Sequence, residues 1–430
     1  MKKTTILFLL LLSLWVNASA QLCSSPQSQI DIYPNTIQAR ILNGGDLFTD
    51  LSSAQFFPDP DPNSFNNPAT IYAAGIWMGG LDPGGNLKLA ASTYRNSSDF
   101  DYTAGPLSPD GLTEEFTCAN WDRHFRATRN QIKSFLAAPP LNAAELKSLY
   151  PAIAGWPAVG NAYFSSIYGF DLPFTSQPLA PFHDEDEDGL YDPLKGDYPC
   201  VLLRGIPEFV PTEIIWCVFN DNGAPHSNTN GAPLRAEFQL TVWGFNTPNQ
   251  PELNRTLFTS HKIIYRNTDY LDSTFVGIWV DTDLGCYLDD YVGCNPGLST
   301  MFAYNTDAVD GQPGNTCSGT PTFPGAAPVQ SITFLNHQMD VFGTIANQSV
   351  GNPPSGATDP SLPAEYYRYL SGSWKDGSHF TVGGNGYGGS TPTSYLFPDD
   401  PANAGGWSMC TANLASGDLR MLGATKRIYF

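Results

Sequence analysis

Carboxylates stand at alternate positions within residues 184–192, and a glycine follows the third of them. In this stretch, DEDEDGLYD, the side chains of Asp184, Asp186 and Asp188 occupy positions one, three and five of a potential loop. Gly189 then supplies a turn at position six. A Ca²⁺ ion takes about six to eight oxygen ligands, and the D-x-D-x-D-G pattern provides three carboxylates, a turn and then a backbone carbonyl. The sequence therefore predicts a calcium site that stabilises structure.

The remaining ligands of this loop are less regular. Leu190 would supply the backbone carbonyl at position seven, and Asp192 the side chain at position nine. Position twelve is Lys195, where an EF-hand has a bidentate glutamate, so we expect a different kind of loop that is closed by Asp197. The alternative is a solvated acidic run, the usual state of clustered charge. The position of the glycine and the nearby turn residues favour calcium.

A second acidic group follows a predicted strand at 274–280. Asp281 and Asp283 are two residues apart, so in a strand their side chains point to the same side. A turn at the glycine that follows can bring Asp289 or Asp290 back toward them, which predicts another calcium site. The alternative is a polar turn whose aspartates cap backbone amides.

The first 20 residues have the pattern of a secretory signal peptide. Two lysines precede an apolar run at 6–16, and Ala18-Ser19-Ala20 precedes the expected cleavage before Gln21. The apolar run is too short to span a bilayer, so we expect an exported protein without a membrane span. Cleavage would leave 19 basic and 41 acidic side chains, a formal charge of −22. Nucleic acid and anionic membrane surfaces are therefore poor partners.

All eight cysteines lie beyond the signal peptide, which predicts up to four disulfides in an oxidising compartment. Cys286 and Cys294 are close enough in sequence for a disulfide between them to close one short loop, and we expect this disulfide. Cys200 and Cys217 bracket the segment after the acidic loop. The others have no obvious partner: Cys23, Cys118, Cys317 and Cys410. A cysteine nucleophile is the competing interpretation, but no cysteine stands in a signature context.

Composition and periodicity predict an all-β fold, an antiparallel sandwich or jelly roll with a short helical insertion and long Gly/Pro-rich loops. The 40 glycines and 36 prolines, with only 14% charged residues, suit short strands joined by long turns. Within 236–245, apolar residues alternate with Glu, Gln and Thr, so we expect one buried face. Strands are expected at 214–219, 236–245, 257–265 and 274–280, and surface loops at 310–328 and 348–363.

The chain is expected to form two regions after the signal peptide. An N-terminal β-rich region covers 21–180, and a region with the calcium loop and the sandwich covers 181–430. The helical insertion lies near 129–150, where Asn142 and Glu145 predict a capping box and the following proline ends the helix.

Short aromatic, glycine and aspartate motifs occur in order along 37–420. They include GIWMGGLD at 75–82, AASTYR at 90–95, DFDY at 99–102, GWPAVGN at 155–161, DGLYDP at 188–193, GDYP at 196–199, DTDLG at 281–285 and DDYVGC at 289–294. In this order they resemble a family of large secreted proteins of Bacteroidota and related phyla. Members of that family typically end in a sorting domain read by the type IX secretion machinery, and their biochemical role is mostly unassigned. The resemblance therefore implies where the protein is delivered, more than which reaction or ligand it serves.

The sequence departs from that family at its end. It stops at Phe430, directly after a GDLR motif at 417–420, where the family continues toward further modules and the sorting domain. We expect a truncated sequence. If the protein does end at Phe430, we expect it to lack the sorting domain for transport across the outer membrane and to stay in the periplasm.

A structural, adhesive or binding role follows from these features, for a calcium-stabilised protein that is secreted or held at the cell surface. Its partner would be an extracellular ligand such as a glycan or a surface protein. The alternative is a secreted hydrolase acting on polysaccharide or protein, although the chain contains neither H-E-x-x-H nor G-x-S-x-G. A pocket with convergent carboxylates of perturbed pKa would favour the enzyme.

Overall fold

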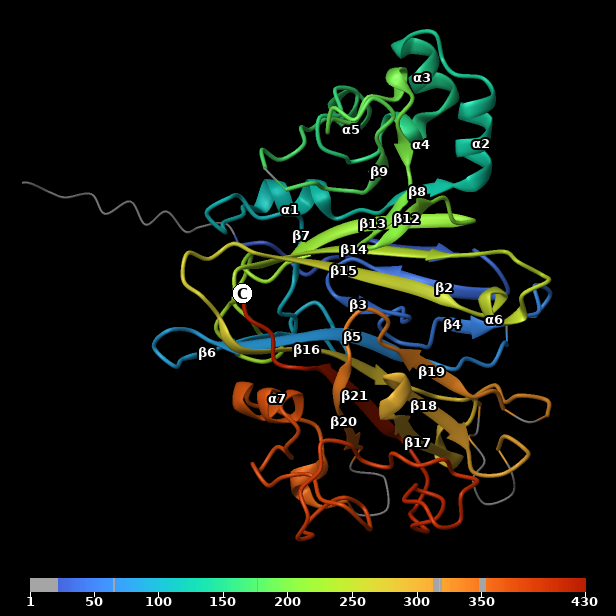
Figure 1. Ribbon diagram of the computed structural model, residues 1–430, viewed down its shortest axis with the longest axis vertical. Helices are drawn as coiled ribbons and strands as arrows, with labels where there is room; N and C mark the ends of the chain where they lie inside the picture. The colour runs from blue at the N-terminus through green and yellow to red at the C-terminus, as the bar shows by residue number, and fades with distance from the viewer. Residues whose placement is uncertain are drawn as a thin grey trace, which may run out of the picture.

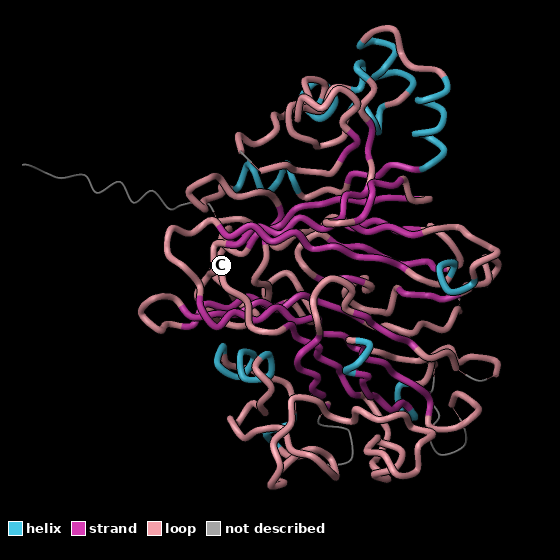
Figure 2. The backbone as a smooth tube through the Cα atoms, in the orientation of Figure 1, coloured by secondary structure: helices cyan, strands magenta, loops and turns pink. Residues whose placement is uncertain are grey.

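Strands fill the middle of the molecule, and most of its helices lie toward the two ends (Figure 1 and Figure 2). The computed structural model describes residues 22–430 except 65, 176, 312–316, 318, 326 and 348–352. The predicted signal peptide, residues 1–20, lies outside the described residues. The fold is all-β with small helical parts, as the composition predicts.

The larger sheet has nine antiparallel strands. Its order is β1-β2-β3-β5-β16-β21-β20, with β4 beside β2 and β6 beside β5. The bounds are β1 (Gln29–Ile32), β2 (Ile37–Leu42), β3 (Asp46–Leu47), β4 (Phe56–Pro58), β5 (Ala73–Leu81), β6 (Leu87–Ala91), β16 (Asp272–Asp281), β20 (Met339–Ala346) and β21 (Leu419–Thr425). Residues from the start and the end of the chain thus meet in one sheet.

The second sheet lies above β2, β5 and β16 in Figure 1. Its order is β15-β14-β13-β7, with β8 also beside β13. The bounds are β7 (Thr103–Ala104), β8 (Phe125–Thr128), β13 (Glu213–Asn220), β14 (Ala236–Gly244) and β15 (Leu257–Tyr265). Three smaller sheets pair β9 (Phe182–His183) with β10 (Tyr198–Pro199), β11 (Val201–Leu203) with β12 (Ile206–Phe209), and β17 (Asp290–Asn295) with β18 (Thr300–Asn305) and β19 (Gln330–Thr333).

The alternation in 236–245 misleads about burial, because every residue of β14 is buried. The carboxylate of Glu237 lies 3.1 Å from the Arg266 guanidinium and accepts a hydrogen bond from the backbone N–H of Leu107 at 3.0 Å. Buried charges are tolerated when they are paired and hydrogen-bonded. The expected single buried face is therefore wrong, and β14 is covered on both sides.

Helices α2 and α3 occupy the predicted insertion. The Asn142 side chain caps α3 by accepting hydrogen bonds from the backbone of Ala144 and Glu145, but the Glu145 carboxylate bonds the backbone N–H of Leu141, so the capping box is incomplete. The helices are α1 (Glu115–Trp121), α2 (Arg129–Ala137), α3 (Ala143–Leu149), α4 (Pro151–Ala154), α5 (Phe164–Tyr168), α6 (Pro251–Asn254) and α7 (Pro363–Leu370), with 3-10 turns η1 (Pro193–Lys195), η2 (Tyr287–Asp289), η3 (Pro296–Leu298) and η4 (Ser355–Ala357).

Strand β13 separates two hydrophobic cores. Its side chains alternate, so Ile215 and Phe219 face the core between the two large sheets, while Ile214 and Trp216 face a core under the helices. Because β7 and β8 pair with β13, segments from before and after residue 180 share one sheet.

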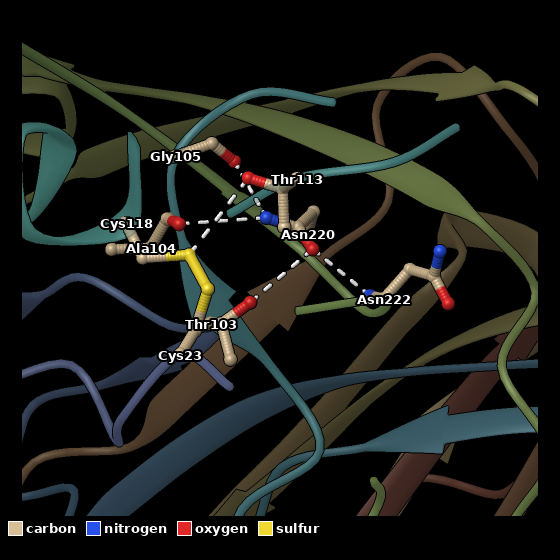
Figure 3. The surroundings of a disulfide bond; sticks show 8 residues. All are labelled: Cys23, Thr103, Ala104, Gly105, Thr113, Cys118, Asn220 and Asn222. Atoms are coloured by element: carbon tan, nitrogen blue, oxygen red, sulfur yellow. Dashed lines mark hydrogen bonds between the residues drawn. A yellow bond between two sulfur atoms is a disulfide. The ribbon is translucent and has the colours of Figure 1, made fainter. Parts of the chain in front are cut away.

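Two disulfides connect distant segments. Cys23 is bonded to Cys118, and the side chain of Asn220 lies beside this bridge, holding Thr103 and the loop that follows it (Figure 3). Cys286 is bonded to Cys317. The expected Cys286–Cys294 bridge is therefore wrong.

The reason lies in the β17–β18 hairpin. The register of this hairpin turns the Cys294 side chain into the core, where its thiol faces the carbonyl of Leu396. The cysteines that remain unbridged are Cys200, Cys217, Cys294 and Cys410, so the described chain has two disulfides and not four.

Candidate functional site

The predicted calcium loop brings its three carboxylates together. Asp184, Asp186 and Asp188 each offer an oxygen that lies within 4.8 Å of the other two. The turn at Gly189 has a φ of 78°, which favours glycine, and its backbone N–H donates to Asp184 at 2.8 Å. The spacing read from the sequence therefore corresponds to a folded loop with converging acidic side chains.

A lysine already neutralises part of this charge. The ammonium group of Lys195 lies 2.8 Å from an Asp186 oxygen and 2.6 Å from an Asp188 oxygen. These hydrogen bonds raise the pKa of Lys195. A calcium ion bound by both aspartates would have to displace this ammonium group.

The other predicted ligands organise the loop backbone. Asp197 is fully buried, and its two oxygens accept hydrogen bonds from the backbone of Glu185 at 2.9 Å and of Asp192 at 2.7 Å. Asp192 caps the 3-10 turn η1. Leu190 donates its backbone N–H to Asp188 at 2.8 Å. The loop is thus held in shape by its own hydrogen bonds.

The second acidic group is buried at the end of β16. Burial raises the pKa of Asp281 to about 6, in spite of a nearby guanidinium. Burial and neighbouring carboxylates raise the pKa of Asp283 well above its usual range. One oxygen of Asp290 accepts a hydrogen bond from the backbone of Leu284 at 2.9 Å. Among the described residues, no group of three ligand atoms within 4.8 Å of one another contains Asp281, Asp283 or Asp290.

Asp289 turns toward a different segment. It accepts a hydrogen bond from the backbone of Gly311 at 2.9 Å, and with Asp310 and Cys286 it forms a second group of atoms within 4.8 Å. The Cys286 sulfur belongs to a disulfide and offers no thiolate to a metal. Asp289 and Asp310 therefore brace the loop around this bridge.

A cavity of about 320 Å³ opens beside Asp281 and Asp283. Antiparallel register places Arg420 of β21 directly opposite Asp281 of β16. The Tyr94 hydroxyl donates to an Asp281 oxygen and accepts from Arg420 Nε at 2.7 Å. The cavity is lined by Thr49, Leu51, Tyr72, Tyr94, Arg95, Asp281, Asp283, Tyr287, Asp418 and Arg420.

Tyr94, Asp418 and Arg420 have no role in the sequence interpretation. They are far from Asp281 along the chain. The pairing of β16 with β21 places Arg420 opposite Asp281, and the Tyr94 hydroxyl, which comes from the segment after β6, contacts both side chains. The signal present in the sequence is limited to the family-like motifs AASTYR and GDLR, which contain them.

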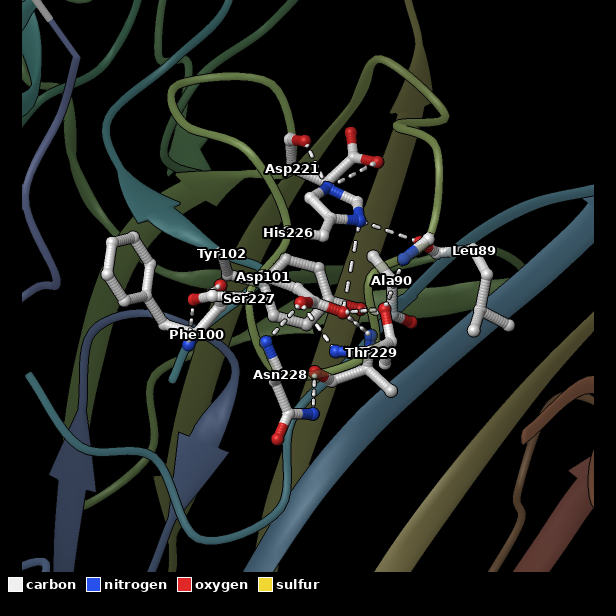
Figure 4. A network of polar contacts seen from close by, with 12 residues as sticks. Leu89, Ala90, Phe100, Asp101, Tyr102, Asp221, His226, Ser227, Asn228 and Thr229 are labelled. Carbon is white, nitrogen blue, oxygen red and sulfur yellow. Dashed lines mark hydrogen bonds and ion pairs between the residues drawn. The ribbon is translucent and has the colours of Figure 1, made fainter. Parts of the chain in front are cut away.

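A buried histidine network lies between the two large sheets (Figure 4). The ring nitrogens of His226 lie 2.7 Å from the carbonyl oxygen of Leu89 and 2.6 Å from that of Asp221. Carbonyl oxygens only accept hydrogen bonds, so a ring nitrogen that carries a proton can donate to the carbonyl beside it. The carboxylates of Asp101 and Asp221 lie 3.8 and 3.7 Å away. Sequence reasoning missed this network.

No protein family, curated protein or solved structure matches this chain. Among the described residues, no helix is both long and apolar enough to cross a membrane.

Proposed function

We propose that this chain is an exported, calcium-stabilised binding or structural protein that acts outside the cytoplasm. The observation that carries the proposal is the convergence of the Asp184, Asp186 and Asp188 carboxylates within 4.8 Å of one another in an exposed loop. Oxygen-only donor sets of this kind suit a hard cation such as Ca²⁺. The loop links the helical region to the strands that follow it, so an ion there would stabilise the connection between them.

Export is supported by the two disulfides, since such bonds persist mainly in oxidising compartments. Delivery to the cell surface or medium by the type IX machinery would follow if a sorting domain belongs to the same gene product. This location is tested by measuring, by proteomics, the amount of the protein in the periplasm, on the cell surface and in the medium.

Calcium binding is tested by thermal unfolding in calcium and in chelator. An ion that binds the native state alone stabilises it by about 2.7 kcal/mol when its free concentration is roughly 100-fold above Kd. We expect a higher Tm in calcium for the parent protein and for Asp269→Asn, which removes an exposed carboxylate elsewhere. Asp186→Asn should lose this rise in Tm, because it removes one of the three converging carboxylates. The calcium-free loop should keep its shape, because the Asp186 carboxylate contacts Lys195 and not the loop backbone.

The proposal fails if Tm is the same in calcium and chelator and the purified protein contains no bound metal. The same titration counts the ions. We expect Asp283→Asn to bind as many calcium ions as the parent, because Asp281 and Asp283 belong to neither group of ligand atoms that gathers within 4.8 Å in the described residues.

A secreted hydrolase is the second candidate, and the cavity favours it. Asp281 and Asp283 both have a raised pKa, so a carboxylic acid is available near neutral pH as a general acid. Two carboxyl groups in one cavity are also the usual machinery of glycoside hydrolysis. The test is release of reducing ends from polysaccharides by the parent and by Asp283→Asn. Activity that is absent in the parent, or retained in the variant, rejects this candidate.

A further inference from the structure

Residues that line the cavity beside Asp281 carry buried polar atoms whose hydrogen-bonding capacity is unused. Asp281 and Arg420 are only 5% and 6% exposed, and both line the cavity. Within the described part of the chain, one oxygen of Asp281, one oxygen of Asp418 and Nη1 of Arg420 have no hydrogen-bond partner. Arg420 Nη1 lies 3.6 Å from Asp359, and Arg420 Nε lies 3.6 and 3.5 Å from the unpartnered oxygens of Asp281 and Asp418. These ion pairs are too long for hydrogen bonds. Such groups are costly to bury unless something satisfies them.

These unused groups differ in kind, and the difference restricts the ligand. The two carboxylate oxygens need donors, whereas the guanidinium nitrogen needs an acceptor. A metal ion or an ammonium group would satisfy the carboxylates but not Arg420. An anion would satisfy Arg420 and be repelled by Asp281 and Asp418. A hydroxyl group both donates and accepts, so a ligand with several neighbouring hydroxyls matches the whole set.

The remaining walls fit the same ligand. The rings of Tyr72 and Tyr94 and the side chain of Leu51 line the cavity and offer apolar surface beside the polar groups. Tyrosines combine such apolar area with a polar tip. The C–H face of a sugar ring can pack on this surface while its hydroxyls reach the charged groups.

We propose that this cavity, at the end of β16, binds one ring of a neutral saccharide. Asp281 and Asp418 accept hydrogen bonds from its hydroxyls, and Arg420 donates to one of them. The inference rests on the binding role proposed above and is independent of the calcium loop, so a failure of either can be recognised separately.

The test is saturation-transfer NMR on the full chain in calcium-containing buffer. The probe is a mixture of D-glucose, D-galactose, D-mannose, D-xylose, L-fucose and N-acetyl-D-glucosamine, with D-glucuronate in a separate sample. We expect transfer to at least one neutral sugar and no preference for glucuronate, because Arg95 and Arg420 in the lining are offset by aspartates and no net positive charge favours a carboxylate. Asp418→Ala should weaken binding about tenfold or more, since it removes a charged acceptor.

A second variant blocks the cavity sterically, so that the test does not depend on correct folding of Asp418→Ala. Leu51 is 43% exposed at the cavity, so Leu51→Trp should fill the opening and abolish the signal. Leu141→Trp, at a position that is 87% exposed and outside the cavity lining, is the matched control and should bind like the parent. No transfer to any neutral sugar, transfer to glucuronate alone, or a signal unchanged in Leu51→Trp would each overturn the proposal.

Discussion

Replacing His226 by phenylalanine tests the buried histidine network. The substitution keeps an aromatic ring but removes both ring nitrogens. The carbonyls of Leu89 and Asp221 then lose their partners, at about 1–3 kcal/mol for each buried unsatisfied group. With two such carbonyls, we expect a loss of about 2–6 kcal/mol in the free energy of unfolding.

The local structure limits the cost. Asp101 still accepts hydrogen bonds from the backbone of Ala91, Asn228 and Thr229 and from the Thr229 hydroxyl, so it remains satisfied without the histidine. Asp221 depends more on the charge, because burial raises its pKa and His226 opposes that shift. Without His226 the pKa of Asp221 rises further, and stability is lost as pH rises through that value. The cost should therefore be smaller at acidic pH.

Urea unfolding followed by tryptophan fluorescence measures this loss for His226→Phe, with the exposed His337→Phe as control. The control should stay within about 0.5 kcal/mol of the parent. A loss below about 1 kcal/mol in His226→Phe, or one that does not vary with pH, would refute this role of His226 in the network.

Three further predictions concern the acidic sites and the second disulfide. Lys195→Met should strengthen calcium binding, since the ion no longer has to displace an ammonium group; calorimetric titration that finds equal or weaker affinity contradicts this. Between about pH 4 and pH 7, Asp281→Asn should gain on the order of 3 kcal/mol in stability relative to the parent. The reason is that the parent loses stability as pH rises through the raised pKa of Asp281, about 6. A stability difference in urea unfolding that does not change with pH would count against this. Cys286→Ser should cost about 3.7 kcal/mol for a loop of 31 residues, and peptide mapping of the parent that pairs Cys286 with Cys294 would disprove the bridge.

Local patterns predicted local structure well. Strand β15 has the expected bounds, and β13, β14 and β16 differ from expectation by one or two residues at their ends. The D-x-D-x-D-G spacing also predicted which three carboxylates converge. Both succeed because alternation and loop spacing depend on residues that are close together in the chain.

Long-range pairings account for the failures. The sequence pattern predicts that the face of β14 that contains Glu237 is exposed to solvent. That face is buried, because Arg266, which is distant in sequence, pairs with Glu237. Closeness in sequence favoured Cys294 as the partner of Cys286, but the hairpin register turns that side chain into the core. The cavity likewise depends on β21 lying against β16, which no local pattern indicates.

The position of β21 also has a consequence for the order of synthesis. This strand follows β20 in the sequence but lies between β16 and β20 and pairs with both. Until residues 419–425 are available, β16 forms an edge of the larger sheet and β20 has no neighbouring strand in it. A chain still emerging from the ribosome would expose two strand edges there, and such edges are prone to pair with other chains. The larger sheet therefore cannot be completed before residues 419–425 have been synthesised.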